Sequence, residues 1–316
     1  MQGGSEHSDQ AEPGAWIITP GNHDGVHLGH RALLRTARRL ADRHGYRTRA
    51  LTFEPHPAAL IDPAHAPEKL TLQPRRAELL RGAGADSVVV QPFTHEFAAL
   101  APEAFVERLL AQGARGIVIG PDFRFGYQRQ GDVALLRKLG ASRGFEVCIE
   151  EPVLLQEQRV SSTAIRQALR SGDVKTAYQM LGRYHEVSGL VVKGDQRGRT
   201  IGFPTANLQA EPVMPPSDGV YAVVARDLGA PERVVELGIA NLGTRPTFAA
   251  GRSLEVYLFD FDRDLYGAQL RVGFVERVRG ERRFSGVDEL RAQIERDCEQ
   301  ARQLLAAGRT ELEQWI

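Results

Sequence analysis

A chain of 316 residues is long for a single hydrophobic core, so its length predicts two domains. The formal net charge is zero, the pI is about 7.2 and no apolar run is long enough to span a bilayer, so we expect neither nucleic acid nor a membrane among its partners. Only two cysteines occur, Cys148 and Cys298, which excludes a disulfide framework and predicts a cytoplasmic protein.

The chain begins with a polar stretch, residues 1–14, for which we expect a disordered tail without a secretory leader. Residues 16–18 are apolar and predict a strand, and the apolar spacing of residues 32–40 predicts a helix. Residues 21–30, with the sequence GNHDGVHLGH, lie between them. This order predicts a strand, a glycine-rich turn and the start of a helix.

The composition of this turn suits a nucleotide phosphate. Free backbone N–H groups at a helix N-terminus attract anions. His27 and His30 are spaced to share one helix face, where imidazoles can donate to charge developing on a phosphoryl group, and Gly29 leaves room for a ligand. A turn with two solvated histidines and a zinc-binding pair remain alternatives, although no residues complete a zinc site.

Strand-like and helix-like segments alternate through the rest of the first half. The expected strands are 49–53, 87–90, 116–120 and 145–149, and the expected helices are 75–81, 102–110 and 133–139. Prolines at 55 and 57 are expected to stop both strand and helix. The alternation predicts a parallel sheet covered by helices on both faces, with its ligand beyond the carboxyl ends of the strands. His27, His30 and His56 fall at that edge.

Two later segments carry further candidate groups. In GPDFRFG, residues 120–126, Phe123 and Phe125 flank an arginine and either stack a flat ring or fill the core. In RVSSTAIR, residues 159–166, a serine before the apolar spacing predicts a helix N-cap. Arg159 and Arg166 are suited to clamp phosphates that leave as pyrophosphate, although capping alone explains the hydroxyl groups.

After a short helix at 176–181 the chain becomes strand-rich, with frequent glycine and proline, and we place the domain boundary near Arg183. The expected strands are 185–192, 219–225, 234–239, 253–259 and 269–275, and a final helix is expected at 287–305. Short strands at this spacing predict a sandwich or a barrel.

Thr205 and Asn207 are two residues apart, so their oxygens face one side of an extended segment. Hard oxygen ligands together with substrate phosphates are what Mg²⁺ prefers, although a polar hairpin explains the same residues. Glu255 alternates with apolar neighbours and faces away from their side of the strand. It is either a general base or a solvated carboxylate.

Five segments resemble motifs of the bacterial bifunctional riboflavin kinase/FMN adenylyltransferase (FAD synthetase) family. They are G-x-F-D-G-V-H-x-G-H at 21–30, G-x-D-F-R-F-G at 120–126, S-S-T-x-I-R at 161–166, R-G-R-x-x-G-F-P-T-A-N at 197–207 and E-V-x-x-x-D-F-x-x-D-L-Y-G at 255–267. His23 replaces the family's phenylalanine, and its imidazole either adds a titratable group beside the phosphates or fills the same space as a neutral ring.

The resemblance covers nearly all of residues 15–305. It implies a Rossmann-like nucleotidylyltransferase domain with a parallel sheet at 15–182 and an antiparallel riboflavin-kinase barrel with a terminal helix at 183–316. The implied activities are ATP-dependent phosphorylation of riboflavin to FMN and adenylylation of FMN to FAD, with Mg²⁺ and small-molecule substrates. The sequence does not determine whether the chain forms homo-oligomers.

The resemblance also implies roles for individual residues. In the first domain, His27 and His30 are catalytic, and the ATP phosphates meet Gly21, Asp24, Gly25, Gly29, Arg159, Ser162 and Arg166. The flavin and nucleotide pocket is bordered by Asp122, Phe123 and Phe125. In the second domain, Glu255 is the base, Arg197, Gly198, Arg199 and Gly202 bind ATP, and Thr205 and Asn207 hold Mg²⁺.

Overall fold

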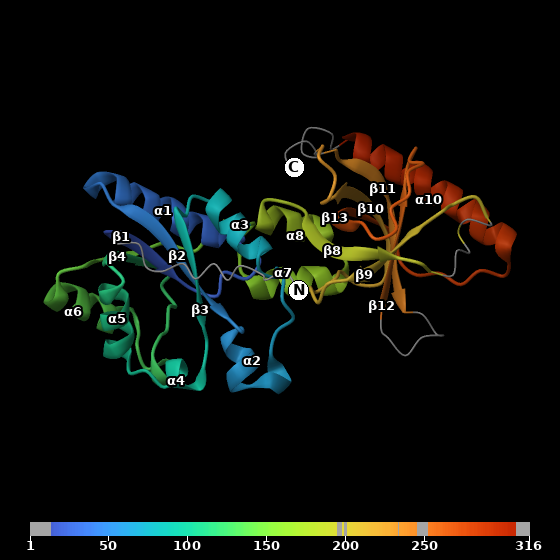
Figure 1. Cartoon of the computed structure of the whole chain (residues 1–316). Coiled ribbons are helices and arrows are strands. Elements are labelled where there is room, and N and C mark those ends of the chain that lie inside the picture. Colours follow the sequence, from blue (N-terminus) through green and yellow to red (C-terminus); the bar gives the residue numbers. More distant parts are fainter. Residues whose placement is uncertain (1–13, 195–197, 199–200, 233, 245–251, 308–316) are drawn as a thin grey trace, which may run out of the picture. The chain divides into compact units, whose positions relative to one another are not determined.

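The computed structural model describes residues 14–194, 198, 201–232, 234–244 and 252–307 (Figure 1). By its internal contacts the chain divides into two compact units, Met1–Val160 and Ser161–Ile316. The tail predicted at 1–14 lies outside the described residues, apart from Gly14. Within the described part of the chain, no helix combines the length and the apolar character needed to cross a membrane.

The first unit is built on a five-stranded sheet with the order β3-β2-β1-β4-β5, and all of its neighbouring strands are parallel. The strands are β1 Trp16–Pro20, β2 Arg47–Glu54, β3 Ser87–Pro92, β4 Ala114–Ile119 and β5 Glu146–Ile149. The helices are α1 Leu28–His44, α2 Pro57–Ile61, α3 Arg75–Gly82, α4 His95–Ala98, α5 Pro102–Ala111 and α6 Val133–Arg143. The predicted parallel α/β architecture is confirmed.

Strand β1 is the point at which the order of the strands in this sheet reverses. The chain runs outward from β1 through β2 to β3 and then returns to the other side of β1 with β4 and β5. Apolar side chains cover both faces of the sheet, with Phe105 and Leu136 in one cluster and Leu34 and Leu80 in another. Ligands of such folds bind where the strand order reverses, beyond the carboxyl ends of the strands. The turn after β1 therefore occupies the expected place for a site.

Several short elements of the first unit escaped prediction. The expectation that the prolines at 55 and 57 stop a helix was wrong, because Pro57 begins α2. Proline fits the first turn of a helix, where its missing N–H has no intrahelical partner to lose. A two-stranded ribbon, β6 Leu154–Leu155 and β7 Gln158–Arg159, was also missed. Two-residue strands carry too little periodicity to be read from sequence.

The second unit begins with α7 Ser162–Ser171 and α8 Val174–Leu181 and continues into a closed antiparallel barrel with the order β10-β11-β12-β9-β8-β13. Its strands are β8 His185–Val192, β9 Ala206–Ala210, β10 Gly219–Asp227, β11 Glu236–Thr244, β12 Arg252–Leu258 and β13 Gln269–Arg279. A barrel rather than a sandwich is therefore present. Strand β9, which was not predicted, closes the barrel between β12 and β8.

The final helix, α10 Val287–Ala307, packs on the outside of the barrel over β10, β11 and β13 (Figure 1). Ala301 and Leu305 of the helix lie in one buried cluster with Ala222 and Ile239 of the barrel. On β12, Leu254 and the next two alternate residues are buried on the opposite, inner side. Glu255 and Tyr257 consequently point outward, toward the side on which α10 lies.

The helices α7 and α8 belong to the barrel's unit by their contacts. The amide of Ser217 donates to the carbonyl of Leu169 at 2.9 Å, and the guanidinium of Arg277 reaches the carbonyl of Ser171 at 3.4 Å. The compact units thus divide after Val160. A functional boundary near Arg183 remains a prediction.

Candidate active sites

The first candidate site is the turn between β1 and α1. His27 is the N-cap of α1, and its Nδ1 accepts a hydrogen bond from the amide of Gly29 at 3.2 Å. The rings of His27 and His30 are stacked, with centroids 3.7 Å apart and planes 19° apart. The two imidazoles therefore share one face, as their spacing predicted, at a helix N-terminus that favours anions.

The backbone of this turn leaves little room for larger side chains. A Cβ at Gly29 would lie 3.0 Å from Cε1 of His27, and Gly25 has φ of +84°. Val26 adopts φ of +41°, which is rare for a β-branched residue. Strained positions of this kind cluster at sites where the surrounding structure holds a functional geometry.

Asp24 is almost completely buried, at 2% exposure. Its Oδ1 accepts from the amides of Leu70 at 3.0 Å and Thr71 at 3.1 Å. These contacts tie the turn to the segment that precedes α3. The predicted contact of Asp24 with ATP phosphates stays a prediction, whereas an anchoring role is evident from the hydrogen bonds.

His23, which replaces the family's phenylalanine, is buried beneath the stacked pair. Its Nε2 donates to the carbonyl of Thr19 at 3.0 Å, and its ring meets His30 edge-on at 5.0 Å between centroids. Burial lowers the pKa of His23 from 6.5 to about 4. The imidazole is therefore neutral at neutral pH, which favours the space-filling alternative.

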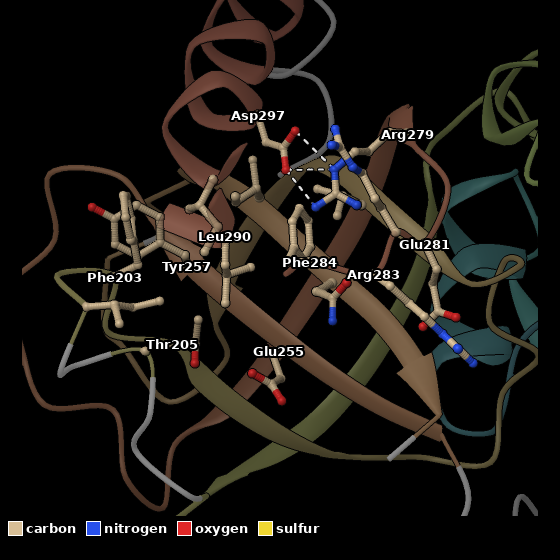
Figure 2. A pocket seen from close by; sticks show the side chains of 17 residues that line it. Phe203, Thr205, Glu255, Tyr257, Arg279, Glu281, Arg283, Phe284, Leu290 and Asp297 are labelled. Carbon is tan, nitrogen blue, oxygen red and sulfur yellow. Dashed lines mark hydrogen bonds and ion pairs between the residues drawn. The ribbon is translucent and has the colours of Figure 1, made fainter. Parts of the chain in front are cut away.

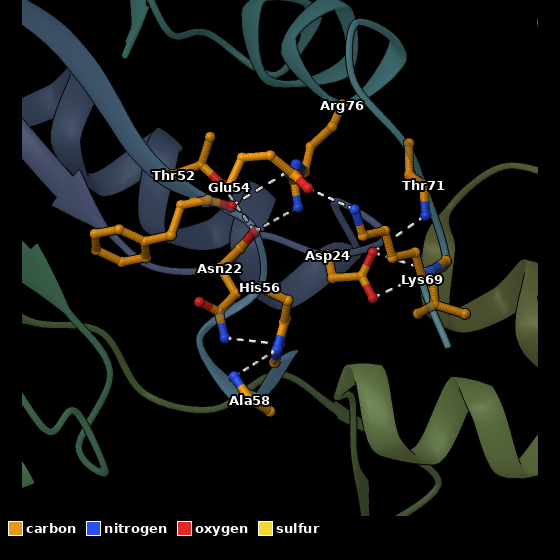
Figure 3. Close-up of polar contacts among 11 residues, drawn as sticks. Asn22, Asp24, Thr52, Glu54, His56, Ala58, Lys69, Thr71 and Arg76 are labelled. Carbon is orange, nitrogen blue, oxygen red and sulfur yellow. Dashed lines mark hydrogen bonds and ion pairs between the residues drawn. The ribbon is translucent and has the colours of Figure 1, made fainter. Parts of the chain in front are cut away.

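A polar network that sequence reasoning missed borders the turn (Figure 3). The Glu54 carboxylate accepts from Lys69 at 2.5 Å and from Arg76 at 2.7 Å. Arg76 is 1% exposed and also reaches the carbonyl of Asn22 at 3.4 Å. Although partial burial opposes it, the hydrogen bond from Lys69 and the two positive charges hold the pKa of Glu54 below its ordinary value.

The segment after β4 brings together residues from two predicted motifs. Arg159 forms an ion pair with Asp122, and this contact lowers the pKa of the Asp122 carboxyl. Phe125 is 5% exposed and belongs to the hydrophobic core, and Phe123 stacks on it at 5.5 Å. The core-filling alternative therefore describes Phe125, and the predicted contact of both rings with substrate is untested.

Helix α7 carries Ser162 and Arg166, the remaining candidate residues of the segment 159–166. Ser161 is its N-cap, and the Oγ of Ser161 accepts from the amide of Ala164 at 3.1 Å. The predicted N-cap is thus confirmed. Ser162 opens the helix and Arg166 is buried on it. Both belong to the second compact unit, whereas Arg159 belongs to the first.

The second candidate site is a cavity of about 600 Å³ between the outer face of the barrel and the start of α10. Glu255 and Thr205 lie at one end, and an ion pair of Arg279 with Asp297 at 2.9 Å lies at the other (Figure 2). Apolar and aromatic side chains line the space between, namely Val220, Ile239, Tyr257, Phe284, Leu290 and Ile294. The volume and lining are typical of a small-molecule pocket.

Strand register brings polar side chains together beside the Glu255 end of this cavity, which Thr205, Asn241 and Glu255 line. Glu255 on β12 stands directly opposite Asn207 on β9 and opposite Asn241 on β11. Directly opposed side chains on neighbouring antiparallel strands lie on one face. Thr205 precedes Asn207 by two residues and lines the same cavity. Hydroxyl, carboxamide and carboxylate oxygens thus gather on one face, a donor set that fits Mg²⁺.

A second cavity, of about 360 Å³, shares Thr205 with the first. Its wall includes Phe261, Asp262 and Tyr266, from the loop after β12. Thr205 therefore borders both cavities. Among the described residues, no group of three or more His, Cys, Asp or Glu side chains could hold a metal ion.

The glycine motif that precedes Thr205 is partly described. A Cβ at Gly198 would lie 2.2 Å from the carbonyl of Phe203, so only glycine fits there, and Gly202 has φ of +91°. The predicted ATP-binding residues Arg197 and Arg199 lie outside the described residues.

The pair of Arg279 and Asp297 was not predicted, although one signal for it existed. Asp297 continues the spacing of Leu290 and Ile294 along α10 and is 2% exposed. An acidic residue on the apolar face of a helix requires a buried partner. Arg279, at the end of β13, supplies that partner in the tertiary structure.

Comparison with known proteins matches the two parts of the chain to two different family models. A family model described as FAD synthetase matches residues 9–164, and one described as riboflavin kinase matches residues 181–305. The bifunctional riboflavin kinase/FMN adenylyltransferase of Escherichia coli K12 is 41% identical over 93% of this chain and 94% of its own length. Its counterpart from Haemophilus influenzae is 39% identical over 90% of this chain and 92% of its own length.

A solved structure is similar over both units. The crystal structure described as a macrolide-efflux protein from Streptococcus pneumoniae has 32% sequence identity to this chain and a TM-score of 0.86. The alignment covers 93% of this chain and 96% of that one. The likeness extends to the parallel sheet and to the barrel alike.

Proposed function

The chain belongs to the bifunctional riboflavin kinase/FMN adenylyltransferase family, and we propose how its residues divide the two reactions. The enzyme phosphorylates riboflavin to FMN with ATP. It then joins FMN to the AMP portion of a second ATP, which gives FAD and pyrophosphate. The roles of individual residues below are our assignment.

Adenylyl transfer belongs to the turn between β1 and α1. The FMN phosphate is already a nucleophile, so neither a general base nor a covalent intermediate is needed. His27 and His30 donate to the charge that develops on the α-phosphate of ATP, and the N-terminus of α1 stabilises the same charge. The main support is the stack of the two rings, 3.7 Å apart, directly at the helix start.

The remaining residues of the first reaction bind and orient. Gly21, Gly25 and Gly29 give phosphates access to backbone amides. Arg159 receives the β- and γ-phosphates that leave as pyrophosphate, and Asp24 keeps the turn in place. Phosphate contacts of Ser162 and Arg166 remain predictions from the family motif. Asp122 and Phe123 border the substrates, with Phe125 supporting Phe123 from the core.

Phosphorylation of riboflavin belongs to the two cavities of the second unit. The apolar cavity beside α10 suits the flat ring system of riboflavin, with its ribityl hydroxyl at the Glu255 end. The smaller cavity suits the nucleotide. The family motif assigns ATP binding to Arg197, Gly198, Arg199 and Gly202, and Gly198 lines the larger cavity. The observation that carries this proposal is the position of Thr205, which lines both cavities and therefore stands where phosphate and acceptor meet. Glu255 takes the hydroxyl proton.

Thr205 and Asn207 supply oxygen ligands for Mg²⁺ in this arrangement. The ion neutralises phosphate charge when bound. A cytoplasmic location, and the lack of nucleic acid and membrane partners, remain predictions from composition.

The test is a Mg²⁺ titration of product formation, with FMN and FAD separated by chromatography. Thr205→Ala and Asn207→Ala should raise the Mg²⁺ concentration needed for FMN formation while leaving the conversion of supplied FMN to FAD unchanged. Gln209→Ala, further along β9 and exposed, serves as the matched control. An unchanged Mg²⁺ requirement in both variants would remove these residues from the metal site.

A further inference from the structure

The contacts of His56 determine which of its ring nitrogens carries the proton. His56 is the N-cap of α2, and its Nδ1 accepts a hydrogen bond from the amide of Ala58 at 3.2 Å. An imidazole nitrogen that accepts carries no proton. Nδ1 is therefore bare, and the proton of the neutral ring lies on Nε2.

The structure places Nδ2 of the Asn22 side chain 3.0 Å from Nε2 of His56, with the carboxamide oxygen on the far side (Figure 3). Two N–H donors cannot share a hydrogen bond, so the carboxamide has to present its oxygen to His56. The two ends of a carboxamide have nearly the same shape, and the surrounding network decides which end faces which way. Asn22 thus accepts from His56, and its NH₂ group takes the opposite side.

The orientation of Asn22 is fixed from several directions. Its backbone carbonyl accepts from Oγ1 of Thr52 at 2.9 Å and from Nη1 of Arg76 at 3.4 Å. In Figure 3 the end of the carboxamide opposite His56 points away from the network of Glu54 and Arg76. The hydrogen bond from His56 also polarises the amide, which strengthens its NH₂ as a donor.

Nearby acidic groups are engaged elsewhere. The Asp24 carboxylate is held by backbone amides, and Glu54 is paired with Lys69 and Arg76. Asn22 itself follows Gly21 in the turn that leads from β1, at the carboxyl edge of the sheet, to the stacked histidines. A directed donor at this place, with Glu54 paired with cations and Asp24 bonded to backbone amides, matches an anionic oxygen.

We propose that Asn22, oriented by His56, donates a hydrogen bond to a phosphate oxygen of ATP or FMN during adenylyl transfer. This inference rests on the assignment of adenylyl transfer to the β1–α1 turn. Asn22 is then a substrate-binding residue, and His56 is a positioning residue that acts through it.

Two substitutions separate this role from a structural one. Asn22→Asp keeps the shape and still accepts from His56, but it turns a negative oxygen toward the phosphate. Asn22→Ala removes the side chain without adding repulsion. We expect kcat/KM for FAD formation to fall about 10²-fold in Asn22→Asp and about 10-fold in Asn22→Ala. A purely structural role predicts the reverse order, because Asp preserves the contact with His56, and that order would overturn the proposal.

The same assay identifies the source of the phosphate. A rise in KM for ATP at saturating FMN assigns the contact to the nucleotide, and a rise in KM for FMN at saturating ATP assigns it to the flavin. Unchanged constants for both substrates would also overturn the proposal. Ser142→Asp is the charge control, because Ser142 is exposed near the end of α6, at the amino edge of the same sheet. It should leave both constants unchanged.

Two further readouts keep this inference distinct from the assignment on which it rests. FMN formation from riboflavin, measured on each variant, reports that the barrel unit is folded and active, and hydrogen exchange of the parallel sheet reports that the first unit is folded. His30→Ala tests the assignment of adenylyl transfer to the turn, which fails if this variant forms FAD normally. If His30→Ala loses FAD formation while the Asn22 variants keep it, only the present inference fails. Nitrogen chemical shifts of His56, assigned by comparison with His56→Gln, should show a protonated Nε2, and a protonated Nδ1 contradicts the argument.

Discussion

The two candidate sites are built in opposite ways. The adenylyl-transfer site takes its stacked histidines from one continuous turn, held by a buried Asp24 and by an N-cap. The kinase site takes Asn207, Asn241 and Glu255 from three different strands, and register alone brings them together.

This difference has physical consequences. A site within one turn is formed as soon as its strand and helix pack, and its precision comes from restricted backbone angles such as those of Gly25 and Val26. A site spread over strands exists only when the barrel is closed, and its precision comes from strand pairing. The first is therefore sensitive to local substitutions, and the second to any change that shifts a strand.

The largest expected effect is that of Glu255→Gln, which keeps the shape of the side chain and removes its basicity. FMN formation should fall by about 10²–10⁴-fold, because a positioned general base contributes that much. FAD formation from supplied FMN should be unaffected. Single-turnover measurements of both reactions test this, with Glu211→Gln on an exposed part of the barrel unit as control. Equal losses in both reactions would contradict the proposal that the two reactions have separate sites.

His30→Ala tests the adenylyl-transfer site in the turn between β1 and α1. Loss of one donor to the transition state costs about 3–4 kcal/mol, so FAD formation should fall by about 10²–10³-fold while FMN formation persists. His44→Ala, at the far end of α1, is the matched control and should behave as the wild type. If both activities disappear together in His30→Ala, the reactions do not have separate sites.

Asp24→Ala tests whether the stability of the first unit can change without a change in the barrel unit. The substitution leaves the buried amides of Leu70 and Thr71 without their acceptor, which should destabilise the first unit by about 2–4 kcal/mol. Hydrogen exchange read by mass spectrometry should show faster exchange around these two amides and unchanged protection in the barrel. Equal loosening of the barrel would contradict the independence of the two units.

The smallest effect on catalysis is expected for His23→Phe. With the pKa of His23 lowered to about 4, its imidazole is neutral throughout pH 6–9, so the FAD-forming activity of wild type and variant should follow the same pH profile. A difference in these profiles would restore an electrostatic role for His23.

His23→Phe should nevertheless alter stability in acid. Between pH 6.5 and about 4 the unfolded chain binds a proton that the folded chain rejects, so the wild type loses stability as the pH falls through that range. The loss amounts to about 3 kcal/mol at its limit, and the variant should escape it. Urea unfolding at pH 7 and at pH 4.5 measures the difference.

The sequence by itself determined the local parts of this protein. The strand, turn and helix around His27 and His30, the alternating strands and helices of the first unit, the N-cap before Ser162 and the outward side of Glu255 all followed from neighbours a few residues apart. Backbone angles, capping and periodicity act over that range, so each segment carries its own information.

The tertiary structure decided what depends on distant partners. It paired Glu255 with Asn207 through the unpredicted strand β9, gave Asp297 its partner on β13 and brought the side chain of Asn22 to His56. It also sent Phe125 into the core. Such choices depend on strand register, barrel closure and the matching of buried donors with acceptors. These are properties of groups that meet only after the chain has folded, and no local pattern records them.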